Sequence, residues 1–200
     1  MPTTLLDVMI ARFADSKSLE TVQRTVAVLF VTVLTIGASQ ISIPLPFTPV
    51  PFTFQPMVVL VGAAVLGARA GAMSQCLYLA LGVAGLPVFA ASPILPQGVL
   101  RLVGPTGGYL MAYPIAAFVA GSLAERGFDR RYLTEVVAML CGLAMVFAGG
   151  VAWLAFGQPH VGLSAALAAG LYPFIAADIV KLLAAAGVMP AVWRLTGLRG

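Results

Sequence analysis

Long apolar runs separated by short polar connections fill most of this chain, and their lengths are those of membrane-spanning helices. A helix needs about 20 apolar residues to cross the hydrocarbon core of a bilayer. We therefore expect a single domain, residues 1–200, in which residues 1–25 form a polar amphipathic segment and residues 26–195 form an all-α bundle of six transmembrane helices. The expected helices are Val26 to about Ile43, Thr53 to Gly67, Gly71 to Leu86, Gly107 to Leu123, Leu133 to about Phe156 and Pro173 to about Leu195.

Helix-start residues support three of these boundaries. Thr53 is suited to cap the second helix, which tolerates Pro56 in its first turn. Pro105 and Thr106 stand before the fourth helix, and Pro173 occupies the first-turn position that proline favours in the sixth.

Composition excludes a soluble fold and argues against nucleic-acid binding. Apolar residues make up 60% of the chain and the mean hydropathy is +1.02, whereas charged residues are only 9%, against about 25% in soluble domains. The net charge is +4, but the eleven Lys and Arg residues are scattered singly or in pairs and form no single basic patch. Most of the exterior must therefore face lipid.

The distribution of basic residues predicts the orientation of the bundle. Lys and Arg concentrate in short loops on the cytoplasmic side of a membrane. In the expected topology only Arg101 lies on the outer face, and Lys181 lies within the last helix. The remaining basic residues all lie on the other face: Arg12, Lys17, Arg24, Arg69, Arg126, Arg130, Arg131, Arg194 and Arg199. We therefore expect both termini in the cytoplasm.

Asp178 and Lys181 place a carboxylate and an ammonium inside an otherwise apolar helix. Their spacing of three residues puts them on one helix face, about one turn apart, where they can pair. Charge at membrane depth costs roughly 2.5–3.5 kcal/mol per residue, so it is usually kept for a substrate or ion path. The alternative is a structural ion pair that locks the last helix to its neighbours. Because the pair lies in the outer half of that helix, we expect a pocket that opens outward.

Two connections on the outer face are suited to cover such a pocket. The first, Ile43 to Phe54, contains four prolines and three phenylalanines and is too stiff to join a helix. The third, Leu86 to Pro105, is long enough to act as a lid. Its Arg101 has two open interpretations, an anchor to lipid headgroups or a partner for an anionic ligand. The glycine-rich stretch Gly104 to Tyr109 lets backbone amides approach a ligand at a helix N-terminus.

No motif indicates catalysis, ATP hydrolysis or a cofactor. The glycine-rich stretch lacks the Gly-Lys-Ser/Thr ending of a P-loop, and the only histidine, His160, lies in the expected fifth connection. The ligand groupings of zinc, iron and haem sites are missing. We expect neither an enzyme nor a bound cofactor or metal.

Alanines recur every four residues in two of the expected helices. The stripes are Ala112, Ala116 and Ala120, and Ala144, Ala148 and Ala152. Such stripes allow helices to approach closely, either within this bundle or against a separate membrane subunit.

Several segments together carry a resemblance that extends over nearly the whole chain. They are Ile43–Pro46, Pro49–Gln55, Tyr78–Leu79, Leu81–Gly82, Gly85–Ala90, Gly104–Tyr109, and Pro173–Phe174 followed by Asp178 and Lys181. Each motif is weak alone, but the ordered combination resembles the BioY family, the biotin-specific substrate-binding (S) components of energy-coupling-factor (ECF) vitamin transporters.

This resemblance implies a fold, a function and partners. It implies a six-helix bundle in the bacterial cytoplasmic (inner) membrane that binds biotin from outside and delivers it by toppling in the membrane. Energy would come from a transmembrane coupling subunit and two ATPase subunits, which agrees with the missing P-loop. The third loop, Ala90 to Arg101, departs from the glycine- and asparagine-containing version of some relatives, and the docking face for the coupling subunit is unassigned.

The resemblance also implies a binding site, and biotin's chemistry fits it. The family pairs Asp and Lys as biotin contacts at the positions of Asp178 and Lys181, and biotin offers two ureido N–H donors, a carbonyl, an apolar bicycle and a carboxylate tail. Asp178 can accept from a ureido N–H, and Lys181 can donate to the carbonyl or the carboxylate. The full expected set is Asp178, Lys181, Tyr109, Tyr78, Phe52, Phe89, Arg101 and Gln55.

Two other functions stay open. The chain could be the S component for a different vitamin, or a self-sufficient secondary transporter of a small solute that uses Asp178 for proton coupling.

Overall fold

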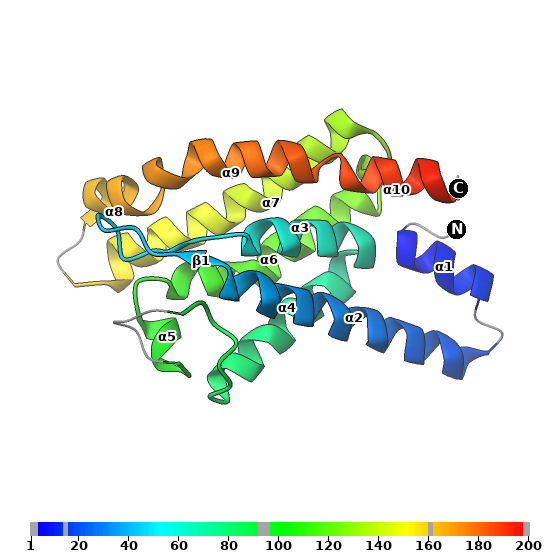
Figure 1. Cartoon of the computed structure of the whole chain (residues 1–200), viewed down its shortest axis with the longest axis horizontal. Coiled ribbons are helices and arrows are strands. Elements are labelled where there is room, and N and C mark those ends of the chain that lie inside the picture. Colours follow the sequence, from blue (N-terminus) through cyan, green and yellow to red (C-terminus); the bar gives the residue numbers. More distant parts are fainter. Residues whose placement is uncertain (1–3, 14–15, 92–96, 160–161, 198–200) are drawn as a thin grey trace.

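The structure is a computed structural model that describes residues 4–13, 16–91, 97–159 and 162–197. Its long helices run along the longest axis of the molecule (Figure 1). Helices α1 and α10 gather at one end with the two chain termini, and α5, α8 and the turn between β1 and β2 lie toward the other end. The elements are α1 (Leu5–Phe13), α2 (Lys17–Gln40), β1 (Ser42–Ile43), β2 (Phe52–Thr53), α3 (Gln55–Leu66), α4 (Ala68–Val83), α5 (Leu100–Val103), α6 (Gly107–Ala124), the 3₁₀ turn η1 (Phe128–Arg130), α7 (Tyr132–Ala152), the π-helical turn η2 (Trp153–Gly157), α8 (Gly162–Gly170), α9 (Tyr172–Ala185) and α10 (Val188–Thr196).

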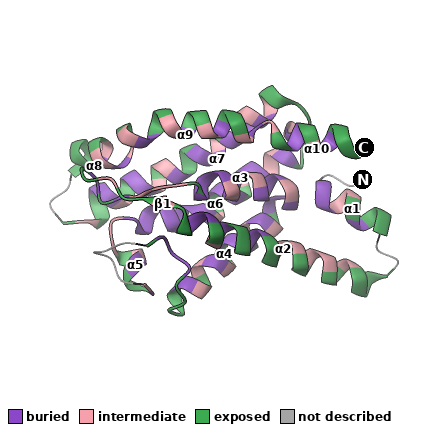
Figure 2. Ribbon diagram, in the orientation of Figure 1, coloured by how far each residue is buried: buried purple, intermediate pink, exposed green. Residues whose placement is uncertain are grey.

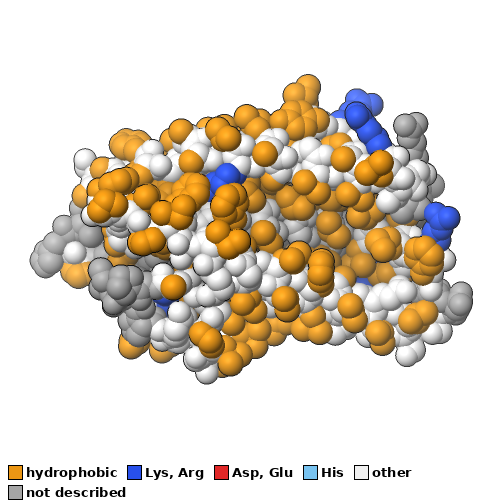
Figure 3. Space-filling view, in the orientation of Figure 1, with side chains coloured by type: hydrophobic (Ala, Val, Ile, Leu, Met, Phe, Trp, Pro, Cys, Tyr) orange, Lys and Arg blue, Asp and Glu red, His pale blue; other side chains and the backbone are white. Residues whose placement is uncertain are grey.

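Within the described ranges, four helical stretches are long and apolar enough to cross a membrane. They are Lys17–Gln40, Gly107–Ala124, Tyr132–Gly157 and Gly162–Thr196. Helix α3 is apolar but has only 12 residues, and α4 has 16. Hydrophobic side chains cover much of the surface in Figure 3, while several Lys and Arg side chains lie at the end that holds the termini. The protein is therefore a mostly helical, multi-pass membrane protein.

The first long helix begins at Lys17, so its predicted start at Val26 was wrong. Ser16 caps it by accepting a 3.2 Å hydrogen bond from the Leu19 amide. An ion pair of 3.2 Å between Glu20 and Arg24, one turn apart, supports the polar first turns. Local capping thus extends the helix into a segment whose hydropathy alone does not indicate a span.

The last predicted helix, Pro173 to Leu195, is interrupted, and a further helix precedes it. Pro173 lies in the first turn of α9, as predicted, but α9 ends at Ala185 and α10 begins at Val188. Pro190 has no N–H to donate to the Ala186 carbonyl oxygen, so the helix is interrupted between Ala185 and Val188. Helix α8 occupies part of the expected fifth connection, and His160 lies outside the described residues.

The first connection contains two short strands, which corrects the all-α prediction. Ser42 pairs with Thr53 and Ile43 with Phe52 in an antiparallel ladder. Thr53 therefore belongs to a strand and does not cap α3, whose capping position is held by Phe54. The prolines between the strands favour extended backbone, which keeps this segment out of a helix.

Helices α3, α6 and α7 form the centre of the bundle, where buried residues concentrate (Figure 2). The alanine stripe of α6 is buried, with Ala116 fully inaccessible, and α7 approaches it through Gly149, where a Cβ would lie 2.7 Å from the Ala112 Cβ. The first stripe thus packs the bundle internally. The second stripe, Ala144, Ala148 and Ala152, is exposed.

Candidate substrate-binding site

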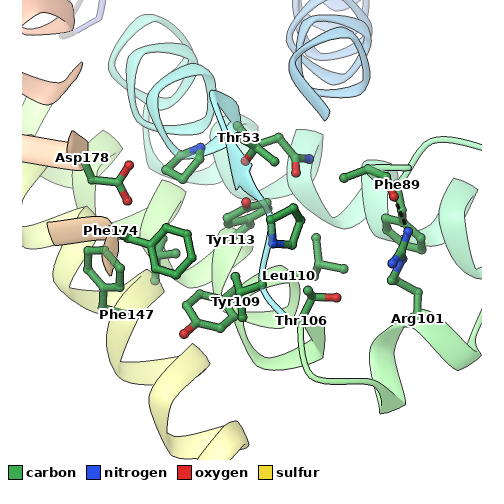
Figure 4. Close-up of a pocket in the computed structure, with 16 residues that line it drawn as sticks. Thr53, Phe89, Arg101, Thr106, Tyr109, Leu110, Tyr113, Phe147, Phe174 and Asp178 are labelled. Carbon is green, nitrogen blue, oxygen red and sulfur yellow. Dashed lines mark hydrogen bonds between the residues drawn. The ribbon is translucent and has the colours of Figure 1, made fainter. Parts of the chain in front are cut away.

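A cavity lies between the first loop, the third loop and helices α3, α6, α7 and α9 (Figure 4). Its volume of about 60 Å³ is several times the minimum that one water molecule needs. Five of the eight residues predicted for the site line it: Asp178, Arg101, Tyr109, Phe89 and Gln55. The fold therefore brings these five predicted side chains together from four separate segments of the chain.

Asp178 and Lys181 form the predicted ion pair on one face of α9. Asp178 lines the cavity, whereas Lys181 lies behind it and donates a 2.7 Å hydrogen bond to the Thr53 carbonyl oxygen. The Lys181 ammonium also lies 3.9 Å from the centroid of the Phe52 ring, a cation–π contact. Phe52 thus supports Lys181 and is not among the cavity-lining residues.

Arg101 is buried at the opposite end of the cavity, with 2% of its surface exposed. Its Nη2 donates to the Ala90 carbonyl oxygen, the bond dashed in Figure 4, while its Nε is buried without a partner among the described residues. No carboxylate of the described residues forms an ion pair with it. Burial lowers the pKa of Arg101 below its ordinary value, but a guanidinium stays protonated in proteins. A side chain as deeply buried as that of Arg101 does not reach lipid headgroups. Because no carboxylate of the described residues neutralises it, the second interpretation, a partner for an anionic ligand group, is favoured.

Aromatic rings form the walls between the two charged ends. Tyr109 is held by a 2.7 Å hydrogen bond from its hydroxyl to the Gly170 carbonyl oxygen. Phe89 packs edge-on against Tyr78, with ring centroids 5.5 Å apart and an interplanar angle of 87°. Tyr78 itself is fully buried behind Phe89 and does not line the cavity. Its contact with the cavity is therefore indirect.

Sequence reasoning missed three further aromatic residues of the cavity: Tyr113, Phe147 and Phe174. Tyr113 follows Tyr109 by one helical turn on α6, so helical spacing was a usable signal. Phe174 belongs to the motif that contains Pro173, but its direction depends on how α9 docks. Phe147 lies in a uniformly apolar stretch of α7 and gives no signal of its own.

The described part of the third loop contributes Phe89, Ala90 and Arg101 to the lining of the cavity, and its role as a lid stays a prediction. Gln97 Nε2 donates a 3.3 Å hydrogen bond to the Phe89 carbonyl oxygen, and the short helix α5 positions Arg101. Residues 92–96 of this loop lie outside the described residues.

These features describe a helical membrane protein with a cavity suited to a small solute. A carboxylate lies at one end of its cavity, a guanidinium lies at the other, and aromatic rings lie between them (Figure 4).

Comparison with known proteins places the chain in a family. The model of the BioY family matches residues 10–197, and the chain belongs to that family. A probable biotin transporter BioY from Pyrococcus horikoshii is 42% identical over 153 residues, 76% of this chain and 85% of the relative. The biotin transporter BioY of Thermotoga maritima is 39% identical over 158 residues, 79% of this chain and 88% of the relative.

This chain has the same fold as a solved structure over most of the length of both chains. It is the crystal structure of the S component for biotin from an ECF-type ABC transporter, and it matches with a TM-score of 0.79 and 27% identity. The match covers 90% of this chain and 95% of that one.

Proposed function

We propose that this protein binds biotin in the cavity between Asp178 and Arg101 and acts in biotin uptake as the S component of an ECF transporter. The observation that carries the proposal is the placement of a carboxylate and of a guanidinium at opposite ends of an aromatic cavity, where no carboxylate of the described residues pairs with the guanidinium. Biotin has the complementary layout, with N–H donors on its ring system, an apolar bicycle and a carboxylate at the end of its tail. The relatives named as biotin transporters support the same ligand.

Each end of the cavity has a distinct role in this proposal. Asp178 accepts a ureido N–H, and Lys181 orients the carboxylate of Asp178 from behind. Arg101 pairs with the biotin carboxylate, replacing the counter-ion that the described residues do not provide. Tyr109 and Phe89 pack against the bicycle and the tail. In a dry cavity these few polar contacts are stronger than they would be in water.

We propose that the whole chain is one membrane domain with six spans and both termini in the cytoplasm. The spans are α2, α3, α4, α6, α7 and α9, of which α3, α4 and α9 are short, and α9 is flanked by the helices α8 and α10. The basic residues at the end that holds α1 and α10 support this orientation, because short cytoplasmic loops are enriched in Lys and Arg. The cavity then lies toward the outer side.

In our proposal, the energy for transport does not come from this chain. We assign the energy to a transmembrane coupling subunit and two ATPase subunits, and we assign no catalytic role to the chain itself. The competing function is secondary transport with proton coupling through Asp178. It shares the buried carboxylate with our proposal but needs no partner.

One uptake experiment separates these functions. Cells that lack biotin uptake would express this chain alone, with a coupling subunit and ATPases, or with ATPases whose hydrolytic residues are inactivated. We expect radiolabelled biotin to accumulate only with the active ATPases and to persist when the proton gradient is collapsed. Accumulation by the chain alone that stops on collapse of the gradient would support the secondary transporter instead.

A further inference from the structure

Thr106 lines the cavity and immediately precedes α6, but its side chain does not cap that helix. A threonine at this position usually has an extended backbone and accepts a hydrogen bond from an amide of the first helical turn. The Thr106 backbone is instead helical, with φ −86° and ψ −7°. Only 8% of the residue is exposed, and its Oγ1 has no hydrogen-bond partner among the described residues. Because buried polar groups are nearly always hydrogen-bonded, this hydroxyl is available to a ligand.

The turn between α5 and α6 places Thr106 at the Arg101 end of the cavity. Gly107 begins α6 so close to α5 that a Cβ there would overlap a backbone carbonyl of α5. Trp153 of η2 donates a 3.0 Å hydrogen bond to the Gly104 carbonyl oxygen and so holds the turn from its other side. In Figure 4 the hydroxyl of Thr106 points toward the Arg101 side chain.

Thr106 and Arg101 each offer a donor that no described residue uses. The Arg101 Nε is buried without a partner among the described residues, and the Thr106 hydroxyl has one proton to donate. A carboxylate only accepts hydrogen bonds, and its two oxygens can take one from each of these donors. The N-terminal end of α6 also favours negative charge, because the helix dipole is positive there.

We propose that Thr106 is a specificity-determining residue whose hydroxyl donates a hydrogen bond to the carboxylate of the ligand, beside Arg101. The inference rests on the proposed biotin-binding function and deepens it. A guanidinium alone attracts any anionic group, whereas a second donor at a fixed position also orients the carboxylate. Together the two side chains select a ligand whose tail ends in a carboxylate over one whose tail ends in an apolar group.

The test compares Thr106→Val and Thr106→Ser with the parent by calorimetric titration of the purified full chain. Valine keeps the shape of threonine without the hydroxyl, and serine keeps the hydroxyl. The probes are biotin and an analogue whose tail ends in a methyl group in place of the carboxylate. We expect Thr106→Val to bind biotin about tenfold more weakly, the cost of a hydrogen bond to a charged group, and to bind the analogue within about twofold of the parent. Thr106→Ser should bind biotin within about threefold of the parent.

The two probes distinguish recognition of the carboxylate from a change in the cavity wall. Equal losses for both probes in Thr106→Val would overturn the proposal, because the threonine would then only shape the wall. Unchanged biotin affinity in Thr106→Val, with a parent that binds biotin, would overturn this inference and leave the proposed function standing. Failure of the parent to bind biotin would overturn both.

Thermal unfolding of the ligand-free protein tests whether the hydroxyl has a structural role instead. Because it bonds no described residue, its removal should not destabilise the ligand-free protein. We expect the melting temperature of Thr106→Val to equal or exceed that of the parent. A lower melting temperature, or a variant that does not fold, would show that the hydroxyl holds the structure and would overturn the proposal.

Thr35→Val is the matched control for this substitution. Thr35 is fully buried on α2, where its hydroxyl donates a 2.9 Å hydrogen bond to the Val31 carbonyl oxygen and accepts one of 3.3 Å from Gln75. We expect this variant to melt at a lower temperature than the parent and to keep the parental ratio of the two affinities. An equal change of the ratio in Thr35→Val and Thr106→Val would overturn the proposal.

Infrared difference spectra of bound biotin test the contact with the carboxylate directly. We expect the carboxylate stretching bands of the bound ligand to differ between the parent and Thr106→Val at saturating biotin, and to return toward the parental position in Thr106→Ser. Bands that are identical in the parent and Thr106→Val would place the carboxylate away from Thr106 and overturn the proposal.

Discussion

The Lys181 ammonium donates a 2.7 Å hydrogen bond to the carbonyl oxygen of Thr53, which lies 128 positions earlier in the chain. The contact joins α9 to the strand that precedes α3. Because Lys181 also pairs with Asp178 and lies over the Phe52 ring, its position is held from three sides. The carboxylate at the cavity is thus oriented by a cation that does not itself line the cavity.

Asp178→Asn should lower biotin affinity by about tenfold or more, because a hydrogen bond to a charged group contributes about 1.5–3 kcal/mol. Lys181→Met should also lower it, since the carboxylate then loses its orienting partner. Each single change leaves one charge unpaired and can destabilise the fold. Calorimetric titration of the double variant, which has no orphan charge, is the control. A folded double variant with parental affinity would make the pair purely structural.

Arg101→Met should remove the protein's preference for a free carboxylate on the ligand. We expect the parent to bind biotin at least about tenfold more tightly than biotinamide, whose tail is uncharged. In Arg101→Met the two ligands should bind with similar affinity, because the buried cation is gone. Competition binding with both ligands measures the ratio. An unchanged ratio in the variant would place the carboxylate elsewhere.

Gly150→Ala should impair ligand binding through Tyr109. A Cβ at Gly150 would overlap the Tyr109 ring, which lines the cavity and is held by the Gly170 carbonyl. We expect the variant to insert but to bind biotin about tenfold or more weakly, of the order of losing an aromatic contact and a hydrogen bond. Gly37→Ala is the matched control, because nothing lies within 4 Å of its Cβ position. Parental affinity in Gly150→Ala would show that the ring does not shape the site.

Trp193→Phe should destabilise the protein in a pH-dependent way. Trp193 Nε1 donates a 2.6 Å hydrogen bond to the fully buried Asp129. Burial raises the pKa of Asp129 above its ordinary 3.8, although the bond from Trp193 and the charge of Arg130 oppose the rise. The folded state therefore holds this proton more tightly than the unfolded state, and stability falls as pH rises from the ordinary value through the folded pKa.

Without the Trp193 donor the pKa of Asp129 rises further, so the loss of stability continues to higher pH. We expect Trp193→Phe to lower the free energy of unfolding by about 1.5–3 kcal/mol more near neutral pH than in acid, where Asp129 is protonated. Detergent-solubilised protein unfolded across this pH range provides the measurement. A loss independent of pH would indicate changed packing alone.

The basic-residue distribution predicts opposite sides of the membrane for Phe47 and Arg126. Both side chains are exposed, Phe47 at 66%. After replacement of Cys76 and Cys141, a cysteine at position 47 should react with a membrane-impermeant thiol reagent added outside whole cells. A cysteine at position 126 should react only after the cells are opened. The reverse pattern would contradict the proposed topology.

Sequence patterns predicted the parts of the fold that depend on local chemistry. Pro173 fixed the start of α9, and the spacing of Asp178 and Lys181 predicted their ion pair. The break before Pro190 and the early start of α2 at Lys17, capped by Ser16, were missed because a hydropathy profile averages over single capping and breaking residues.

The site was predictable where a charge or motif marked it, and not where only packing decides. Asp178 stood out as a charge inside an apolar helix and Arg101 as the only basic residue expected on the outer face, and both line the cavity. Tyr78 was expected to line the cavity but lies behind its wall, and Phe147, which no sequence feature marked, forms part of that wall. A uniformly apolar helix can turn any of its faces toward the cavity. Its packing against the other helices decides which face does so, and a local sequence pattern does not predict that packing.

The most direct test of the account is calorimetric titration of the purified chain, without partner subunits, with biotin, thiamine and riboflavin. We predict saturable binding of one biotin per chain at sub-micromolar concentration, on the order of 8 kcal/mol or more in binding free energy, and no comparable binding of the other two vitamins. The same titration with Asp178→Asn should give a weaker isotherm of unchanged stoichiometry. Tight binding of thiamine or riboflavin, or no saturable binding of biotin by folded protein, would contradict the account.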